Sequence, residues 1–147
     1  LGTAHELLVR DEVEGAAIRE IVERVLAPFI DRGGSRFSIE GPAIRLSPDI
    51  TLALSMALHE LTTNAIKYGA LSVPEGSVQI RWELAGDAAH RRFRFAWVER
   101  DGPPVVPPTR VGFGTRMIER VLSGRVTGTP TMHYPPEGAR FEIEAPV

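Results

Sequence analysis

The sequence has no cysteine, only one lysine and no apolar run long enough to span a membrane. The absence of cysteine excludes disulfides, thiolate metal sites and cysteine nucleophiles, and it suits a reducing compartment. The longest apolar stretch, 50–58, is interrupted by Thr51 and Ser55 and falls short of the roughly 20 residues that a membrane helix needs. No signal-peptide pattern is visible. We therefore predict a cytoplasmic domain with no direct membrane contact.

The charge balance argues against a polyanionic partner. Seventeen basic and 19 acidic residues give a net charge of −2, so the protein has no general attraction to nucleic acid. The basic cluster Arg91-Arg92-Phe93-Arg94 alternates like a strand with one solvated face, and we expect no nucleic-acid partner there. Any anion site must be local.

A chain of 147 residues can form one domain with its own core. It begins with leucine rather than methionine, so we expect it to be a fragment of a longer protein. Residues 1–13 show weak periodicity and are interpreted as a connector from an upstream segment, and 14–147 as the domain.

Periodicity predicts the elements. We expect helices over 14–29, from Pro48 to the region of Tyr68, and after Gly112, with strands near 37–40, 43–46, 78–84, 93–99, 125–129 and 139–145. The first helix should bury one face, made of Ile18, Ile21, Val22, Val25 and Phe29. In the strand near 78–84, the apolar residues Val78, Ile80, Trp82 and Leu84 alternate with polar ones and should share one face. The predicted fold class is α+β: a two-layer α/β sandwich with a mostly antiparallel mixed sheet and about three helices.

The central helix carries the strongest functional signal. Ser47-Pro48-Asp49 favours a helix start, and the following residues are almost all apolar. Near the end, Glu60, Asn64 and Lys67 or Tyr68 recur four and three residues apart, which places a carboxylate, an amide, an ammonium and a phenol on one stripe. A helix end that merely reaches water would explain any one of them, but all four together indicate a ligand. The only lysine, Lys67, suits a phosphate.

A second signal is an acid in an aromatic row. Period two places Phe93, Phe95 and Trp97 on one strand face and continues it to Glu99. A carboxylate that points inward is costly unless a donor binds it. An acid that faces water at the sheet edge is the alternative, and the pattern leaves both open.

The third signal follows a loop. Prolines 103, 104, 107 and 108 predict an extended segment over 100–111, after which Gly112-Phe113-Gly114-Thr115 opens a helix. Two glycines before a helix are weak evidence alone. Thr115, Arg116 and the free amides of the helix start would together suit an anion.

Other motifs are excluded. His59-Glu60 lacks the second histidine of a zinc protease, because Thr63 stands in its place. No Walker A sequence precedes Lys67, and no glycine fingerprint follows the first strand, so a dinucleotide fold is disfavoured.

Together the three stretches resemble one family. The stripe of Glu60, Asn64, Lys67 and Tyr68 resembles the N box of sensor histidine kinases. The Glu99 stretch resembles their first glycine box, and Gly112-Phe113-Gly114-Thr115 their second. His59 before the N-box acid, with Trp97-Val98-Glu99, resembles the HWE subfamily. The resemblance covers about 14–147.

The resemblance implies the ATP-binding fold shared with gyrase, Hsp90 and MutL, with ATP and Mg²⁺ as cofactors and 100–111 as part of an ATP lid. It implies that Asn64 holds Mg²⁺, that Glu99 accepts a hydrogen bond from the adenine amino group, and that Glu60 is the catalytic residue that orients or deprotonates the accepting imidazole. The other residues expected at the nucleotide are His59, Lys67, Tyr68, Gly102, Gly112, Gly114, Thr115 and Arg116. For His59, packing or a supporting hydrogen bond is the only role expected.

Two positions depart from the family pattern. Asp101 stands where the first glycine of the first glycine box is expected, and Ala139-Arg140 replaces a small hydroxyl residue of the last strand. No histidine here lies in a phosphoacceptor motif. The expected partners are therefore an upstream dimerisation domain that carries the acceptor histidine, in a homodimer, and a response regulator.

Two other functions compete with phosphoryl transfer to histidine. One is a binding module of the same fold that ATP gates without transfer; Glu60 beside Asn64 argues against it, because a pure switch needs no base. The other is a serine kinase of the anti-sigma type, which would lack His59 and Trp97-Val98-Glu99.

Overall fold

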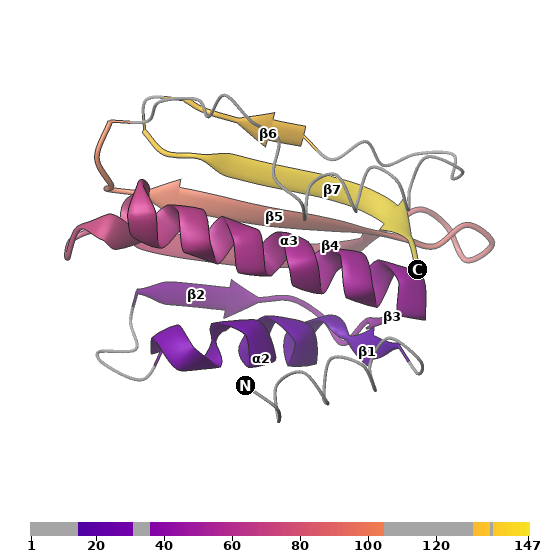
Figure 1. Ribbon diagram of the computed structural model, residues 1–147. Helices are drawn as coiled ribbons and strands as arrows, with labels where there is room; N and C mark the ends of the chain where they lie inside the picture. Colours follow the sequence, from indigo (N-terminus) through magenta and orange to yellow (C-terminus); the bar gives the residue numbers. More distant parts are fainter. Residues whose placement is uncertain (1–14, 31–35, 105–130, 136) are drawn as a thin grey trace.

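A five-stranded mixed sheet forms the framework of the protein (Figure 1). The computed structural model describes residues 15–30, 36–104, 131–135 and 137–147. The strand order is β2 (Phe37–Glu40), β4 (Ser77–Ala85), β5 (Arg92–Arg100), β7 (Arg140–Pro146) and β6 (Thr131–His133). Only β2 and β4 pair in parallel; the other neighbours are antiparallel. A separate antiparallel pair joins β1 (Ala16–Ala17) to β3 (Arg45–Leu46). The predicted mixed, mostly antiparallel sheet is confirmed.

Helices cover one face of this sheet, which gives the predicted two layers (Figure 1). They are α2 (Ile18–Ile30) and α3 (Pro48–Lys67), and a short 3-10 helix, η1 (Ala70–Ser72), follows α3. The helix expected after Gly112 and the strand expected over 125–129 lie outside the described residues. No described helix is both long and apolar enough to cross a bilayer.

The start of α3 follows the predicted signals. Ser47 accepts a hydrogen bond from the Ile50 amide at 3.5 Å, and Pro48 occupies the first turn, where a missing amide costs nothing. The buried hydroxyls within the helix are also satisfied: Ser55 and Thr62 each donate to the carbonyl four residues earlier, at 2.7 Å. This explains how a helix with almost no solvated middle section carries polar residues into the core.

The core lies between the helices and the inner face of the sheet. Its largest members are Phe93, Phe95 and Trp97 of β5, which are essentially inaccessible to solvent. Trp82 of β4 stacks on Phe95 with ring centroids 6.3 Å apart, and its indole N–H donates to the Pro42 carbonyl at 2.7 Å. The aromatic row that the alternation predicted is therefore confirmed.

Two residues expected in the core are exposed. Phe29, at the end of α2, is 40% exposed, and Leu84, near the end of β4, is 47% exposed. On α2 the buried residues all lie between Ile18 and Leu26, and Phe29, seven residues after Val22 on the same helix face, lies beyond them at the helix end.

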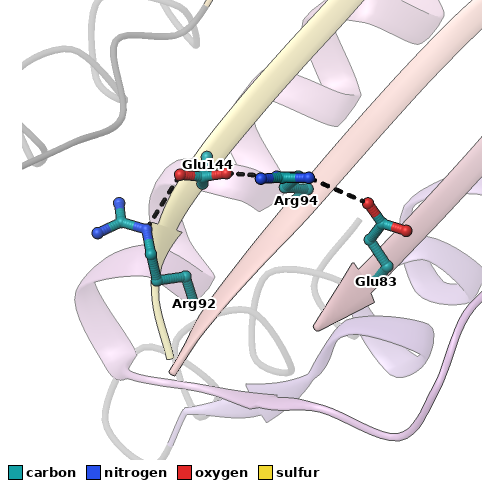
Figure 2. Close-up of polar contacts among 4 residues, drawn as sticks. All are labelled: Glu83, Arg92, Arg94 and Glu144. Carbon is teal, nitrogen blue, oxygen red and sulfur yellow. Dashed lines mark hydrogen bonds and ion pairs between the residues drawn. The ribbon is translucent and has the colours of Figure 1, made fainter. Parts of the chain in front are cut away.

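The outer face of the sheet is charged. Arg94 on β5 forms an ion pair with Glu144 on β7 and a longer one, 3.6 Å, with Glu83 on β4, while Arg92 reaches Glu144 at 3.1 Å (Figure 2). The hydrogen bond and charge of Arg94 lower the pKa of Glu144. Ion pairs this exposed contribute little stability. This face is solvated, as predicted for the basic cluster.

Candidate functional site

The polar stripe of α3 lies at the C-terminal end of the helix. Asn64 and Lys67 are exposed and Glu60 is half-buried, whereas Leu61 and Ala65 between them face the core. Tyr68 caps the helix and is 73% exposed. The Asn64 backbone carbonyl accepts from the Tyr68 amide at 2.8 Å, which closes the last turn. The four side chains are thus presented to solvent by a well-anchored helix end.

The position of Glu99 decides between the two alternatives that the sequence left open, an acid that points inward and an acid that faces water. Its side chain continues the aromatic row of β5 into the interior and is only 5% exposed. The cost of burying it is offset by two donors. The Ala70 amide donates to Oε1 at 3.0 Å, and the Trp97 indole Nε1–H donates to Oε2 at 3.0 Å. The alternative of an acid that faces water is therefore wrong.

Burial raises the pKa of the Glu99 carboxyl, and the hydrogen bonds from Ala70 and Trp97 oppose that rise. A carboxylate has about four lone-pair positions, and the two donors use one on each oxygen. Glu99 can therefore still accept a hydrogen bond from a ligand.

Two glycines allow this close approach of α3 to β5. A Cβ on Gly69 would lie 2.2 Å from Glu99 Oε1, and a Cβ on Gly102 would lie 2.6 Å from the Ala70 Cα. Both positions therefore need glycine for space. The end of the predicted N box and the predicted first glycine box are in direct contact through Glu99 and Gly102.

Asp101, the departure from the family pattern, has a φ of 59° and is the only described non-glycine residue with positive φ. Aspartate tolerates this left-handed conformation better than most residues do. The backbone thus adopts a glycine-like conformation here without glycine, and Gly102 still reaches Ala70.

Tyr134, just after β6, was missed by the sequence reasoning. It is half-buried, and its pKa is raised by burial, then by the negative charges of Glu60 and Glu99. Because the charges of both carboxylates raise the pKa of the Tyr134 phenol, the end of α3, the end of β5 and the residue after β6 lie near one another. Trp97 was expected in the aromatic row and as a family marker, but the hydrogen bond from its indole N–H to Glu99 was not anticipated.

The remaining expectations fare differently. His59 is exposed on α3, so packing in the core does not explain it; its backbone carbonyl accepts from the Thr63 hydroxyl at 2.9 Å. Gly112, Gly114, Thr115 and Arg116, and the expected lid from 105 onward, lie outside the described residues. The described residues hold no group of three or more histidine, aspartate or glutamate side chains that could bind a metal.

Comparisons with known proteins show the family of this chain. The family model for HWE histidine kinases matches residues 1–43. A blue-light-activated histidine kinase of Brucella anthropi is 40% identical over all 147 residues of the chain. The chain belongs to the HWE histidine kinase family. It spans 30% of the length of that relative.

Solved structures place this HWE kinase chain in the expected fold. The catalytic domain of histidine kinase ThkA superposes with a TM-score of 0.62 at 17% identity, covering 90% of the chain and 94% of that domain. ThkA in complex with the response regulator TrrA matches with a TM-score of 0.51 at 16% identity, over 98% of the chain and 47% of ThkA. The chain thus has the α+β fold of a histidine kinase catalytic domain.

Proposed function

We propose that this domain binds ATP with Mg²⁺ at the site formed by the ends of α3 and β5, and transfers the γ-phosphoryl group to a histidine on an upstream dimerisation domain. The observation that carries the proposal is Glu99, a buried carboxylate held by two donors beside the exposed polar end of α3. Residues 14–147 form the catalytic domain in this proposal, and 1–13 connect it to the upstream part.

Glu99 is proposed to recognise adenine. A fixed carboxylate with unused lone pairs suits the adenine amino group, which is a donor, and it does not suit a ring position that only accepts. Trp97 and Ala70 each donate to one oxygen of Glu99, so the carboxylate is oriented before adenine binds. Gly102 lets the chain after β5 lie against Ala70, which closes the adenine side of the site.

Asn64, Lys67 and Tyr68 are proposed to face the phosphates. Asn64 offers an amide oxygen, a ligand type that Mg²⁺ accepts, and phosphate oxygens and water complete its shell in most nucleotide sites. This fits a structure in which the described residues form no protein cage for a metal. Bound Mg²⁺ neutralises charge on the phosphates. Lys67 and the Tyr68 hydroxyl contact phosphate oxygens, and Gly112, Gly114, Thr115 and Arg116 remain proposed contacts.

Glu60 is proposed as the base or orienting group for the acceptor imidazole. It lies one turn before Asn64 on the same stripe, so a histidine that presents its nitrogen to the γ-phosphate can also reach this carboxylate. Phosphoryl transfer depends mainly on positioning and charge neutralisation, which a carboxylate, an amide and an ammonium can supply. His59, exposed on the adjacent position, is proposed only to support Glu60.

The partners are those that this chemistry requires. The acceptor histidine is proposed to lie on the protein's own upstream dimerisation domain, within a cytoplasmic homodimer. A response regulator is proposed to take the phosphoryl group next, because ThkA, which shares the fold, was solved with one.

The function is tested with γ-labelled ATP, given to this chain and to the same protein extended through its preceding segment. We expect label only on the extended protein, and we expect it to be lost in acid and kept in alkali. Nucleotide binding without any label would support the ATP-gated binding module instead. The absence of nucleotide binding would contradict the adenine and phosphate assignments together.

Replacing Glu99 with alanine should weaken the binding of ATP by about 1.5–3 kcal/mol, the range for a hydrogen bond to a charged group. Purine riboside triphosphate, which lacks the 6-amino group, should bind wild type and Glu99→Ala alike. Calorimetry with both nucleotides measures this preference. Equal affinity of the wild type for the two nucleotides would refute the role of Glu99.

The same carboxyl predicts a pH dependence. Because burial raises the pKa of Glu99 above its ordinary 4.5, the folded chain holds more protons than the unfolded chain between the two values. The free energy of unfolding should fall as pH rises from about 4.5 through the raised pKa, and Glu99→Gln should remove this part of the dependence. The preference for ATP should be lost in the opposite direction, as acidification protonates Glu99. Denaturant unfolding across this pH range gives the first measurement.

A further inference from the structure

Arg36 makes an unusual set of contacts behind the proposed adenine site. It lies immediately before β2, half-buried, and its guanidinium donates to three backbone carbonyls of one segment. Nε donates to the Gly76 carbonyl at 3.0 Å, and one terminal nitrogen donates to the Ala70 carbonyl at 3.1 Å and to the Val73 carbonyl. These carbonyls span the connection between α3 and β4.

This connection contains Ala70, whose amide is one of the two donors to Glu99. Arg36 therefore holds the carbonyl of the residue whose N–H holds the carboxylate. Ala70 is 2% exposed and enclosed on other sides as well, because a Cβ on Gly76 would lie 1.8 Å from its carbonyl oxygen. The residue has little room to move once these contacts are made.

The backbone of Arg36 is anchored too. Its carbonyl accepts from the Val78 amide at 2.8 Å, next to the parallel pairing of β2 with β4. The sheet thus fixes the backbone of Arg36, and three carbonyls fix its guanidinium. An arginine fork can hold several acceptors in fixed directions, whereas a lysine ammonium is a single point donor on a flexible stem.

We propose that Arg36 is a positioning residue for adenine recognition: by fixing the segment 70–76 it aims the Ala70 amide at Glu99 and so orients the carboxylate that reads the 6-amino group. This inference rests on the proposed function of Glu99. Arg36 touches no nucleotide itself. Its loss should therefore reduce the discrimination between bases, and a purely structural role would instead weaken all nucleotides equally.

The test compares the ratio of Kd values for purine riboside triphosphate and ATP, by calorimetry in Mg²⁺ buffer, in wild type, Arg36→Met and Arg36→Lys. Wild type should prefer ATP by about tenfold or more, the worth of a hydrogen bond to a charged group. Arg36→Met should lose most of that preference, and Arg36→Lys should be intermediate. Arg81→Met is the matched control: Arg81 is exposed on β4, on the sheet face opposite Ile80 and Trp82, and it should keep the wild-type ratio.

A wild-type ratio in Arg36→Met, even with both affinities lowered, would overturn the inference and leave the role of Glu99 intact. A wild type without preference would overturn the Glu99 assignment itself, so the two failures are distinguishable. If Arg36→Met does not give the circular dichroism of a folded chain, Arg36→Lys decides by the same ratio. In a Glu99→Ala background, Arg36→Lys should change the ratio of Kd values no further, because Arg36 is proposed to act on adenine only through Glu99.

Discussion

Replacing Asn64 with alanine should abolish the magnesium-dependent part of nucleotide binding. Asn64 is exposed, and the contact it makes with Tyr68 uses its backbone carbonyl, which alanine retains. Alanine is also the better helix former, so α3 should be kept or slightly strengthened. The expected loss of ATP affinity in Mg²⁺ is about 100-fold, the scale on which removing one charge-stabilising group acts.

The measurement is calorimetry of ATP binding in Mg²⁺ and in EDTA. Wild type should lose affinity when the metal is removed, and Asn64→Ala should show the same weak binding in both buffers. Thr63→Ala is the control, because the Thr63 hydroxyl donates to its own helix at the His59 carbonyl and faces no proposed ligand. If Asn64→Ala binds ATP in Mg²⁺ as wild type does, the metal assignment is wrong.

Much of the framework that presents Asn64 could be predicted from local sequence. The Ser47-Pro48 start, the period-two strands β4 and β5, and the position of Glu99 all follow from signals within a few residues of one another. Such signals are strong because backbone geometry fixes which side chains share a face. Phe29 and Leu84 were misplaced because they end their elements, where periodicity continues but the opposing layer does not cover them.

The contacts that organise the site were beyond the sequence. The indole of Trp97 and the amide of Ala70 converge on Glu99 from positions two and 29 residues away, and no local pattern encodes such a meeting. Arg36 reaches its three carbonyls across 34 to 40 residues. The sequence placed Glu99 at the end of the aromatic row but left its burial open, and only the structure showed that it is buried and which donors hold it.

The place of Tyr134 at the site was also beyond what the sequence could predict. Its sequence context is a short strand end with no family motif, yet it lies where the negative charges of Glu60 and Glu99 both raise its pKa. It links the proposed base to the proposed adenine acceptor, and this link makes the role of Glu60 testable without any substrate.

Replacing Glu60 with glutamine should lower the rate of phosphoryl transfer by about 10²–10⁴-fold, the usual contribution of a positioned base. ATP affinity should be nearly unchanged, because Glu60 is assigned to the acceptor imidazole rather than to the nucleotide. The measurement is the initial rate of acid-labile labelling in the protein extended through its preceding segment. Glu75→Gln, an exposed acid in the segment before β4, is the control and should label at the wild-type rate.

A second readout separates the place of Glu60 from its chemistry. Because the charge of Glu60 raises the pKa of Tyr134, Glu60→Gln should lower that pKa in the nucleotide-free chain. The chain has two tyrosines, so a Tyr68→Phe background leaves Tyr134 as the only phenol in an absorbance titration. A lowered pKa together with an unchanged labelling rate would put Glu60 at the site but remove it as the base. A lowered pKa and a lost rate are expected together, because the carboxylate that Tyr134 senses is then the one that the acceptor histidine needs.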